Sequence, residues 1–200
     1  MTRDEAWTLV CEFTPSESLR RHMRTVEAVM LHFAEHAGDP SGQPLNPSEL
    51  EKWAVTGLLH DFDYESHPDL GPEGHPFWGV NYLRQHSDLS EDMLEAILGH
   101  YTGSGVTRTT RLARTLFAVD ELSGLITAAA LVRPDKSVMN LEVASIMKKM
   151  KDKAFAKGVN REDIRTGAAE LGLEVEKLVT DVLAAMQSRA EALGLGLRES

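Results

Sequence analysis

Helix-start signals are the feature that most restricts what this 200-residue chain can fold into. Thr14-Pro-Ser-Glu17 has the form of a capping box with proline at the first helical position, and Asn46-Pro-Ser-Glu49 repeats it with asparagine as the cap. After the first of these, apolar residues recur every three or four positions, which is the spacing of one helix face. Because strand-like alternation is nearly absent, we predict an all-α fold.

Apolar periodicity and turn residues place the other helices. The first predicted helix stops at Gly38, the second runs from Pro47 toward His60, and a third runs from Pro76 through Leu83. The remaining predicted helices are marked by Met93–Leu98, Leu112–Val119 and Val175–Met186.

Two parts of the chain are expected on this basis. Residues 14–130 form a helical core, and residues 131–200 form a C-terminal helical extension packed on it. The helix over Val175–Met186 could serve a homodimer as readily as a core, and the tail Gly194–Leu197 is expected to fray because it is glycine-rich.

Composition narrows the classes of function. The formal net charge of -10 argues against binding of nucleic-acid polymers, which requires a basic surface. Cys11 is the single cysteine and cannot form an internal disulfide, and no run of 18 apolar residues is present. We therefore expect a cytoplasmic protein with a small-molecule partner and no membrane segment.

The stretch Leu58–Pro68, LLHDFDYESHP, ends an apolar helix in a histidine and an aspartate. A carboxylate in apolar surroundings costs several kcal/mol unless it is paired or bound to a metal. The position of Asp61 therefore predicts a partner for its charge.

Polar residues on inward helix faces and helix ends supply further candidates. Each alone has an ordinary explanation as a hydrogen-bonded core histidine or a helix cap. Together they suit one or two divalent ions of manganese, iron, cobalt, nickel or zinc, with Asp61 bridging where two are bound. The predicted ligands are His22, His60, Asp61, His75, His100 and Asp120. His67 also precedes a proline and rivals His75; we favour His75 for its helix context.

These residues resemble the HD-domain superfamily of metal-dependent phosphohydrolases, in an HDIG-like hydrolase branch. The resemblance rests on His22 in LRRHMRTVEAVM, the doublet in GLLHDFDYE and Asp120 in LFAVDELSGL, over roughly residues 19–127. The stretches GHPFWGVNYL and EAILGHY are similar to those that supply extra histidines in members with two metals. The resemblance implies a helical bundle around the metal site.

Residues for proton transfer and phosphate binding are less well marked. Many similar phosphohydrolases place an acid three or four residues after the doublet, where this chain has Tyr64 and Glu65, so Asp63 and Glu65 are both candidate acid–base residues. Surface charge is the simpler interpretation of the basic side chains, including the segment Ile146–Arg165 with its local charge of +4. The candidate phosphate contacts are Arg24, Arg133, Lys149 and Lys153.

The sequence thus predicts a metal-dependent phosphohydrolase acting on a nucleotide or another small phosphate ester. Two alternatives stay open: a mixed-valent di-iron oxygenase, which the same ligand pattern serves in some members, and a non-catalytic binding or regulatory module that keeps its metal. Aromatic residues near the predicted ligands, among them Phe62 and Tyr64, could stack on a base or belong to the core.

Overall fold

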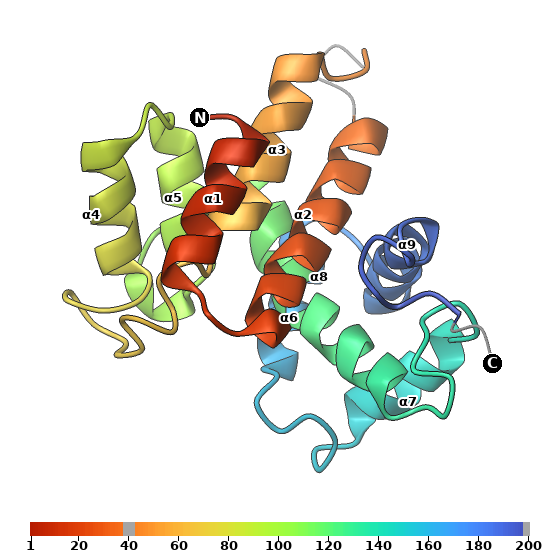
Figure 1. Cartoon of the computed structure of the whole chain (residues 1–200). Coiled ribbons are helices and arrows are strands. Elements are labelled where there is room, and N and C mark those ends of the chain that lie inside the picture. Colours follow the sequence, from red (N-terminus) through yellow and green to blue (C-terminus); the bar gives the residue numbers. More distant parts are fainter. Residues whose placement is uncertain (38–42, 198–200) are drawn as a thin grey trace. The chain divides into compact units, whose positions relative to one another are not determined.

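The computed structural model of the protein describes residues 1–37 and 43–197, which are helical and contain no strand (Figure 1). The predicted all-α class is therefore confirmed. None of the described helices combines the length and hydropathy needed to cross a membrane. The predicted stop at Gly38 lies outside the described residues. The helices are α1 (Arg3–Phe13), α2 (Glu17–Ala37), α3 (Pro47–Leu59), α4 (Phe77–His86), α5 (Glu91–Gly99), the 3₁₀ turn η1 (Thr102–Ser104), α6 (Arg111–Leu131), α7 (Val143–Lys151), α8 (Arg161–Glu170) and α9 (Val175–Ser188).

The chain divides into two compact units, residues 1–117 and residues 118–200. The division falls within α6, whereas the sequence places the boundary after residue 130. The predicted core over 14–130 and extension over 131–200 stay predictions, and the two units are described separately below.

Helix α3 is the centre of the first unit. Every residue from Trp53 to Leu59 is buried, so this helix is enclosed on all sides. It packs against α2, α1 and α5, and α4 packs on α5. The ends of these helices are consequently brought near the C-terminus of α3, where the His60-Asp61 doublet lies.

Gly57 allows α2 and α3 to approach closely. A Cβ atom at this position would lie 3.0 Å from Glu27 Cα and 3.0 Å from Met30 Cγ, both on α2. Overpacking of this kind costs about 1–3 kcal/mol, partly offset by the gain of up to about 1 kcal/mol for alanine in a helix. We expect Gly57→Ala to lower the free energy of unfolding by about 1–2 kcal/mol in urea titrations.

Gly124→Ala is the matched control for this prediction. Gly124 also lies inside a helix, α6, but the nearest atom to an added Cβ is Val159 Cγ2 at 4.0 Å. Alanine there is expected to raise the free energy of unfolding by up to about 1 kcal/mol. Equal stabilisation by both substitutions would contradict the close approach at Gly57.

The two predicted helix starts have different outcomes. Asn46 caps α3 as predicted, with its side chain accepting from Glu49 N at 3.0 Å. The cap predicted at Thr14 is wrong, because α2 begins at Glu17 and Ser16 Oγ accepts from Leu19 N at 3.2 Å. The buried Thr14 hydroxyl instead donates to the Phe62 carbonyl at 2.9 Å, so a long-range contact replaces the local one.

In the second unit α9 contacts α7 and α8. The larger apolar residues from Leu178 to Met186 are buried, so the face that could have served a homodimer is a core face. The homodimer itself stays a prediction.

The glycine-rich tail does not fray within the described residues, and that prediction is wrong. Leu195 is buried, and its carbonyl accepts from Ser137 Oγ at 2.9 Å and from Val138 N at 3.0 Å. Two hydrogen bonds and a buried leucine therefore fix the tail against the loop before α7.

Candidate metal centre

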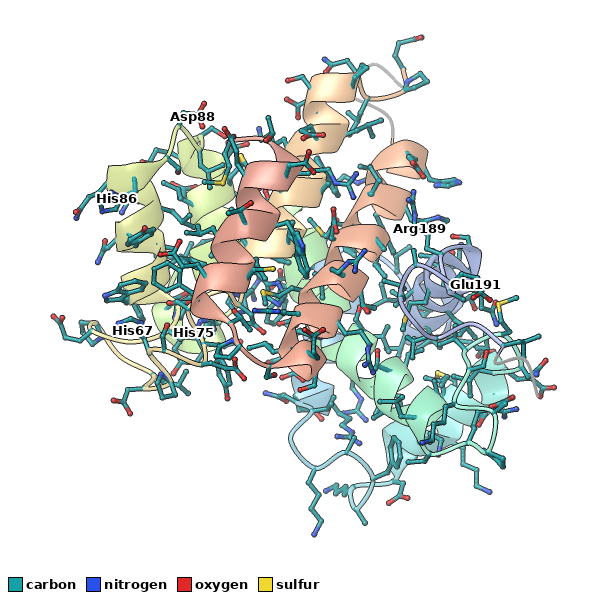
Figure 2. All side chains as sticks on the ribbon, in the orientation of Figure 1. His67, His75, His86, Asp88, Arg189 and Glu191 are labelled. Atoms are coloured by element: carbon teal, nitrogen blue, oxygen red, sulfur yellow. The ribbon has the colours of Figure 1, made fainter. Side chains whose placement is uncertain are left out.

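The histidines of the site lie at or near helix ends of the first unit. His60 is the C-cap of α3, and His100 is the C-cap of α5. His22 lies in the second turn of α2, and His75 lies in the loop just before α4. His67 and His75 lie near the beginning of α4, and His86 lies at its other end (Figure 2). Four histidines from separate elements thus reach one region.

The Asp61 carboxylate is the point on which these histidines converge. Its Oδ2 atom lies 3.3 Å from His60 Nε2 and 3.6 Å from His22 Nε2. Its Oδ1 atom lies 3.3 Å from His75 Nε2 and 3.4 Å from His100 Nε2. Each carboxylate oxygen therefore faces one pair of imidazoles, which is the arrangement expected of a bridging ligand.

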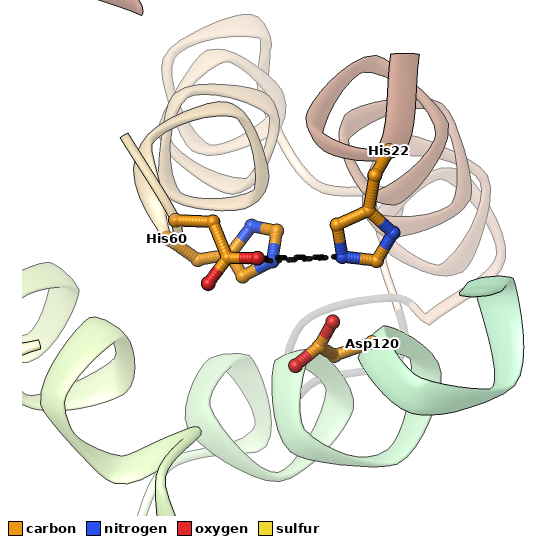
Figure 3. A group of neighbouring side chains, drawn as sticks. His22, His60 and Asp120 are labelled. Atoms are coloured by element: carbon orange, nitrogen blue, oxygen red, sulfur yellow. Dashed lines mark hydrogen bonds and ion pairs between the residues drawn. The ribbon is translucent and has the colours of Figure 1, made fainter. Parts of the chain in front are cut away.

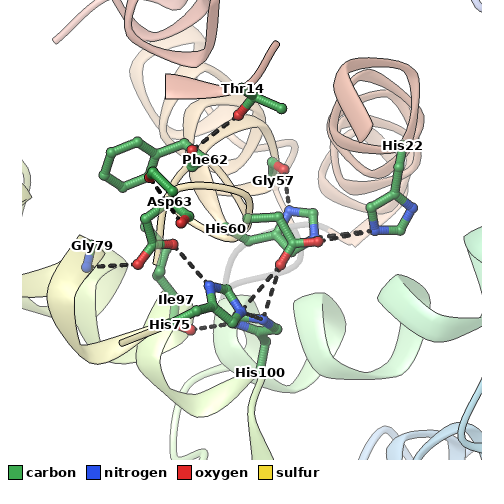
Figure 4. Close-up of polar contacts among 12 residues, drawn as sticks. Thr14, His22, Gly57, His60, Phe62, Asp63, His75, Gly79, Ile97 and His100 are labelled. Atoms are coloured by element: carbon green, nitrogen blue, oxygen red, sulfur yellow. Dashed lines mark hydrogen bonds and ion pairs between the residues drawn. The ribbon is translucent and has the colours of Figure 1, made fainter. Parts of the chain in front are cut away.

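Hydrogen bonds on the far side of the rings fix which nitrogen faces Asp61. The Nδ1 atom of His60 lies 2.8 Å from the Gly57 carbonyl, and that of His100 lies 2.5 Å from the Ile97 carbonyl. The Nδ1 atom of His75 lies 2.8 Å from Asp63 Oδ1 (Figure 4). Since each partner only accepts, Nδ1 carries the proton and Nε2 presents a lone pair to the centre.

The distances within each pair fit a cation. His75 Nε2 lies 3.2 Å from His100 Nε2, and His60 Nε2 lies 3.3 Å from His22 Nε2 (Figure 3). Facing lone pairs repel at this distance unless a proton or a metal ion lies between them. Two nitrogens bound tetrahedrally to zinc at about 2.0–2.1 Å lie roughly 3.3 Å apart. The donor set therefore fits a borderline divalent ion at each pair.

The histidines also control the charge of Asp61. Burial alone would raise the pKa of its carboxyl, but in the metal-free centre His60 and His100, when protonated on the nitrogen that faces Asp61, hold that pKa well below its usual range. The carboxylate thus stays ionised at neutral pH, as a metal ligand must.

Ligand atoms of Asp61, His75 and His100 all lie within 4.8 Å of one another, as do those of His22, His60 and Asp61. The structure therefore brings five of the six predicted ligands together. Of the two histidines that precede a proline, His75 and not His67 lies in this group. The His67 ring instead stacks on Trp78 at 3.7 Å. Asp120 lies on α6 in the second unit, and its place among the ligands stays a prediction.

A separate group lies on α2, away from the predicted ligands in sequence. His32, Glu35 and His36 can each offer an atom within 4.8 Å of the other two. Glu35 and His36 are exposed, which is typical of a weak surface chelate. Measurements of metal content must therefore separate this group from the centre.

The two candidate acid–base residues have different surroundings. Asp63 is 1 % exposed, and its oxygens face His75 Nδ1 and Gly79 N, each at 2.8 Å. Glu65 is exposed, and its carboxylate accepts from Ser16 N at 3.0 Å. Gly79 lies in the stretch GHPFWGVNYL, and the sequence does not predict its contact with Asp63.

The candidate phosphate contacts also have partners or positions of their own. Arg24 lies over the Trp7 ring at 5.2 Å, and Arg133 donates to Asp135 at 3.0 Å. Lys149 lies over Phe155 at 4.1 Å, and Lys153 is exposed. Their role in binding phosphate stays a prediction.

A helical fold with histidines paired around one partly buried aspartate defines a protein with a candidate two-ion metal centre. The family model of the HD domain matches residues 19–125, more than half of the chain. The chain therefore belongs to the HD-domain superfamily of metal-dependent phosphohydrolases. Searches of curated proteins and of solved structures found no match to it.

Proposed function

We propose that this protein is a metal-dependent phosphohydrolase that acts on a nucleotide or another small phosphate ester. The observation that carries the proposal is the Asp61 carboxylate, which faces a histidine pair with each oxygen at 3.3–3.6 Å. His22, His60 and Asp61 would hold one ion, and Asp61, His75 and His100 would hold the other; Asp120 stays the sixth ligand predicted from the sequence. Bound divalent ions supply a water of lowered pKa and draw charge from the phosphoryl oxygens.

Tyr64 supports a substrate with a flat ring. Its side chain is 45 % exposed, and its ring meets the His75 ring edge to face at a centroid distance of 5.2 Å. An exposed aromatic ring beside a candidate ligand can stack on a nucleobase. Phe62 is fully buried and serves the core instead.

Proton transfer and phosphate binding would fall to side chains that can reach solvent. We propose Glu65 for the acid–base role, because its carboxylate is exposed while both oxygens of Asp63 are occupied. Arg24 and Lys153 are exposed and are the proposed phosphate contacts. Arg133 and Lys149 would first have to leave Asp135 and Phe155.

Metal content and phosphate release test the proposal together. The chain is purified without a chelating tag, anaerobically and in air, and metal is counted in the wild type and in His36→Ala. The variant removes the surface group on α2 from the count. We expect about two equivalents at the centre and release of phosphate from nucleoside monophosphates, lost with a chelator and restored by manganese.

Three results would reject the phosphohydrolase. A loaded protein that releases no phosphate from a panel of esters argues against it directly. Iron together with oxygen consumption on a polyol or a phosphonate would favour the oxygenase. Little metal after reconstitution with manganese would favour the non-catalytic module.

A further inference from the structure

Asp63 follows the His60-Asp61 doublet by two residues but makes a different set of contacts. Its side chain is buried, and both oxygens are used, Oδ1 by His75 Nδ1 and Oδ2 by Gly79 N. These contacts connect the chain just after α3 to the loop that carries His75 and to the first turn of α4 (Figure 4).

His75 needs such a partner because of where it lies. His60 and His100 end their helices, so each ring can fold back on a carbonyl three residues earlier. His75 precedes its helix, and the start of a helix offers N–H groups rather than carbonyls. The Asp63 carboxylate accepts from both, which orients the ring and caps α4, whose N-cap residue Pro76 has no side-chain hydrogen bond.

The surrounding chain leaves the carboxylate little freedom. A Cβ atom on Gly79 would lie 2.6 Å from the Asp63 carboxyl carbon, so a glycine is needed there. His67 N donates to the Asp63 carbonyl and His75 N to the His67 carbonyl, each at 2.8 Å. The loop is thus closed on Asp63 through both its backbone and its side chain.

We propose that Asp63 is a positioning residue for one of the two ions. It keeps the His75 proton on Nδ1, so that Nε2 offers its lone pair beside His100 Nε2. The ion held by His75 and His100 therefore depends on Asp63, whereas the ion held by His22 and His60 does not. The expected change in ion binding rests on the proposed metal centre, whereas the expected position of the His75 ring proton does not.

Asp63→Asn is the test, because asparagine keeps the shape and can still accept from Gly79 N. Its amide N–H₂ would then face His75 Nδ1 and favour the other tautomer, with the proton on Nε2. Asp69→Asn, at an exposed position of the same loop, is the matched control. Every protein also carries His36→Ala, which removes the surface group on α2. Metal-free protein is titrated with manganese by calorimetry, and histidine ring tautomers are read from long-range ¹H–¹⁵N spectra.

In the wild type and in Asp69→Asn we expect two binding events and a His75 ring protonated on Nδ1. In Asp63→Asn we expect one event unchanged, the other weakened by about 10–100-fold, and the ring proton on Nε2. Unchanged affinity for both ions, or equal weakening of both, would overturn the positioning role while leaving the proposed function in place.

The tautomer of His75 in the wild-type protein tests the inference even if Asp63→Asn fails to fold or if the wild type binds no metal. A metal-free wild-type protein in which His75 carries no proton on Nδ1 and is protonated on Nε2 alone overturns it without any variant. Absence of metal binding in the wild type would instead count against the proposed function.

Discussion

Replacing Asp61 by alanine is expected to remove both metal ions and to lower kcat/KM for a phosphate ester by at least about 10³-fold. The two oxygens of Asp61 face separate histidine pairs, so this one carboxylate would be a ligand of both ions. Bound ions contribute several kcal/mol to stabilisation of transition-state charge, and each 1.36 kcal/mol corresponds to a factor of about ten in rate. Elemental analysis and phosphate release measure the two effects.

Asp181→Ala is the control for this result. Asp181 is a partly exposed aspartate on α9 that pairs with Lys177 within the same helix. Its loss should leave metal content and phosphate release unchanged. Circular dichroism should show helices in both variants, because the core of α3 lies before the doublet. Stoichiometric metal in Asp61→Ala, counted with His36→Ala also in place to remove the surface group on α2, would refute the bridging arrangement.

The candidate ligands could be selected from the sequence because helical periodicity shows which polar residues face inward. His22 and His100 continue apolar faces, and His60 and Asp61 end an apolar helix. The convergence of their Nε2 atoms could not be predicted this way. It depends on ring orientation, which is fixed by carbonyls of Gly57 and Ile97 and by a carboxylate from another segment.

Helix α1 was not predicted, although a local signal was present. Thr2 and Glu5 form a capping box, but the helix buries only Ala6 and Val10. Two buried positions are too few to reveal a helical period. The stability of α1 comes instead from its packing on α3, which the sequence does not display.

Charge counts alone also misjudge the basic segment Ile146–Arg165. Arg161 does not face solvent with the lysines: its guanidinium donates to backbone carbonyls, including that of Val159 at 2.7 Å. The partners Ala156, Phe155 and Asp152 are contacted in the same way. One of the seven basic residues therefore holds the loop before α8 rather than forming a phosphate-binding surface.

Phe62 lies between two aspartates in sequence, yet it is the residue of this segment whose loss should affect stability most. Its side chain is fully buried, with ring centroids of Phe13 at 5.5 Å, Tyr82 at 6.1 Å and Trp78 at 6.4 Å. It therefore joins α1 to α4 through ring contacts next to the His60-Asp61 doublet. We expect Phe62→Ala to lower the free energy of unfolding by about 3–5 kcal/mol in urea titrations.

This measurement requires metal-free protein. An ion that binds only the folded state, at a free concentration of about 100 times its Kd, would raise the free energy of unfolding by about 2.7 kcal/mol. Tyr64→Ala is the matched aromatic control two residues later. Since Tyr64 is 45 % exposed, its loss should cost about 1 kcal/mol or less. Equal costs at the two positions would mean that the Phe13, Trp78 and Tyr82 cluster does not support the doublet. A large loss of unfolding free energy in Phe62→Ala alone would show that the packing of the Phe62 ring holds the chain just after α3 in place. The neighbouring residues Asp61 and Asp63 can then direct their carboxylates toward the histidines.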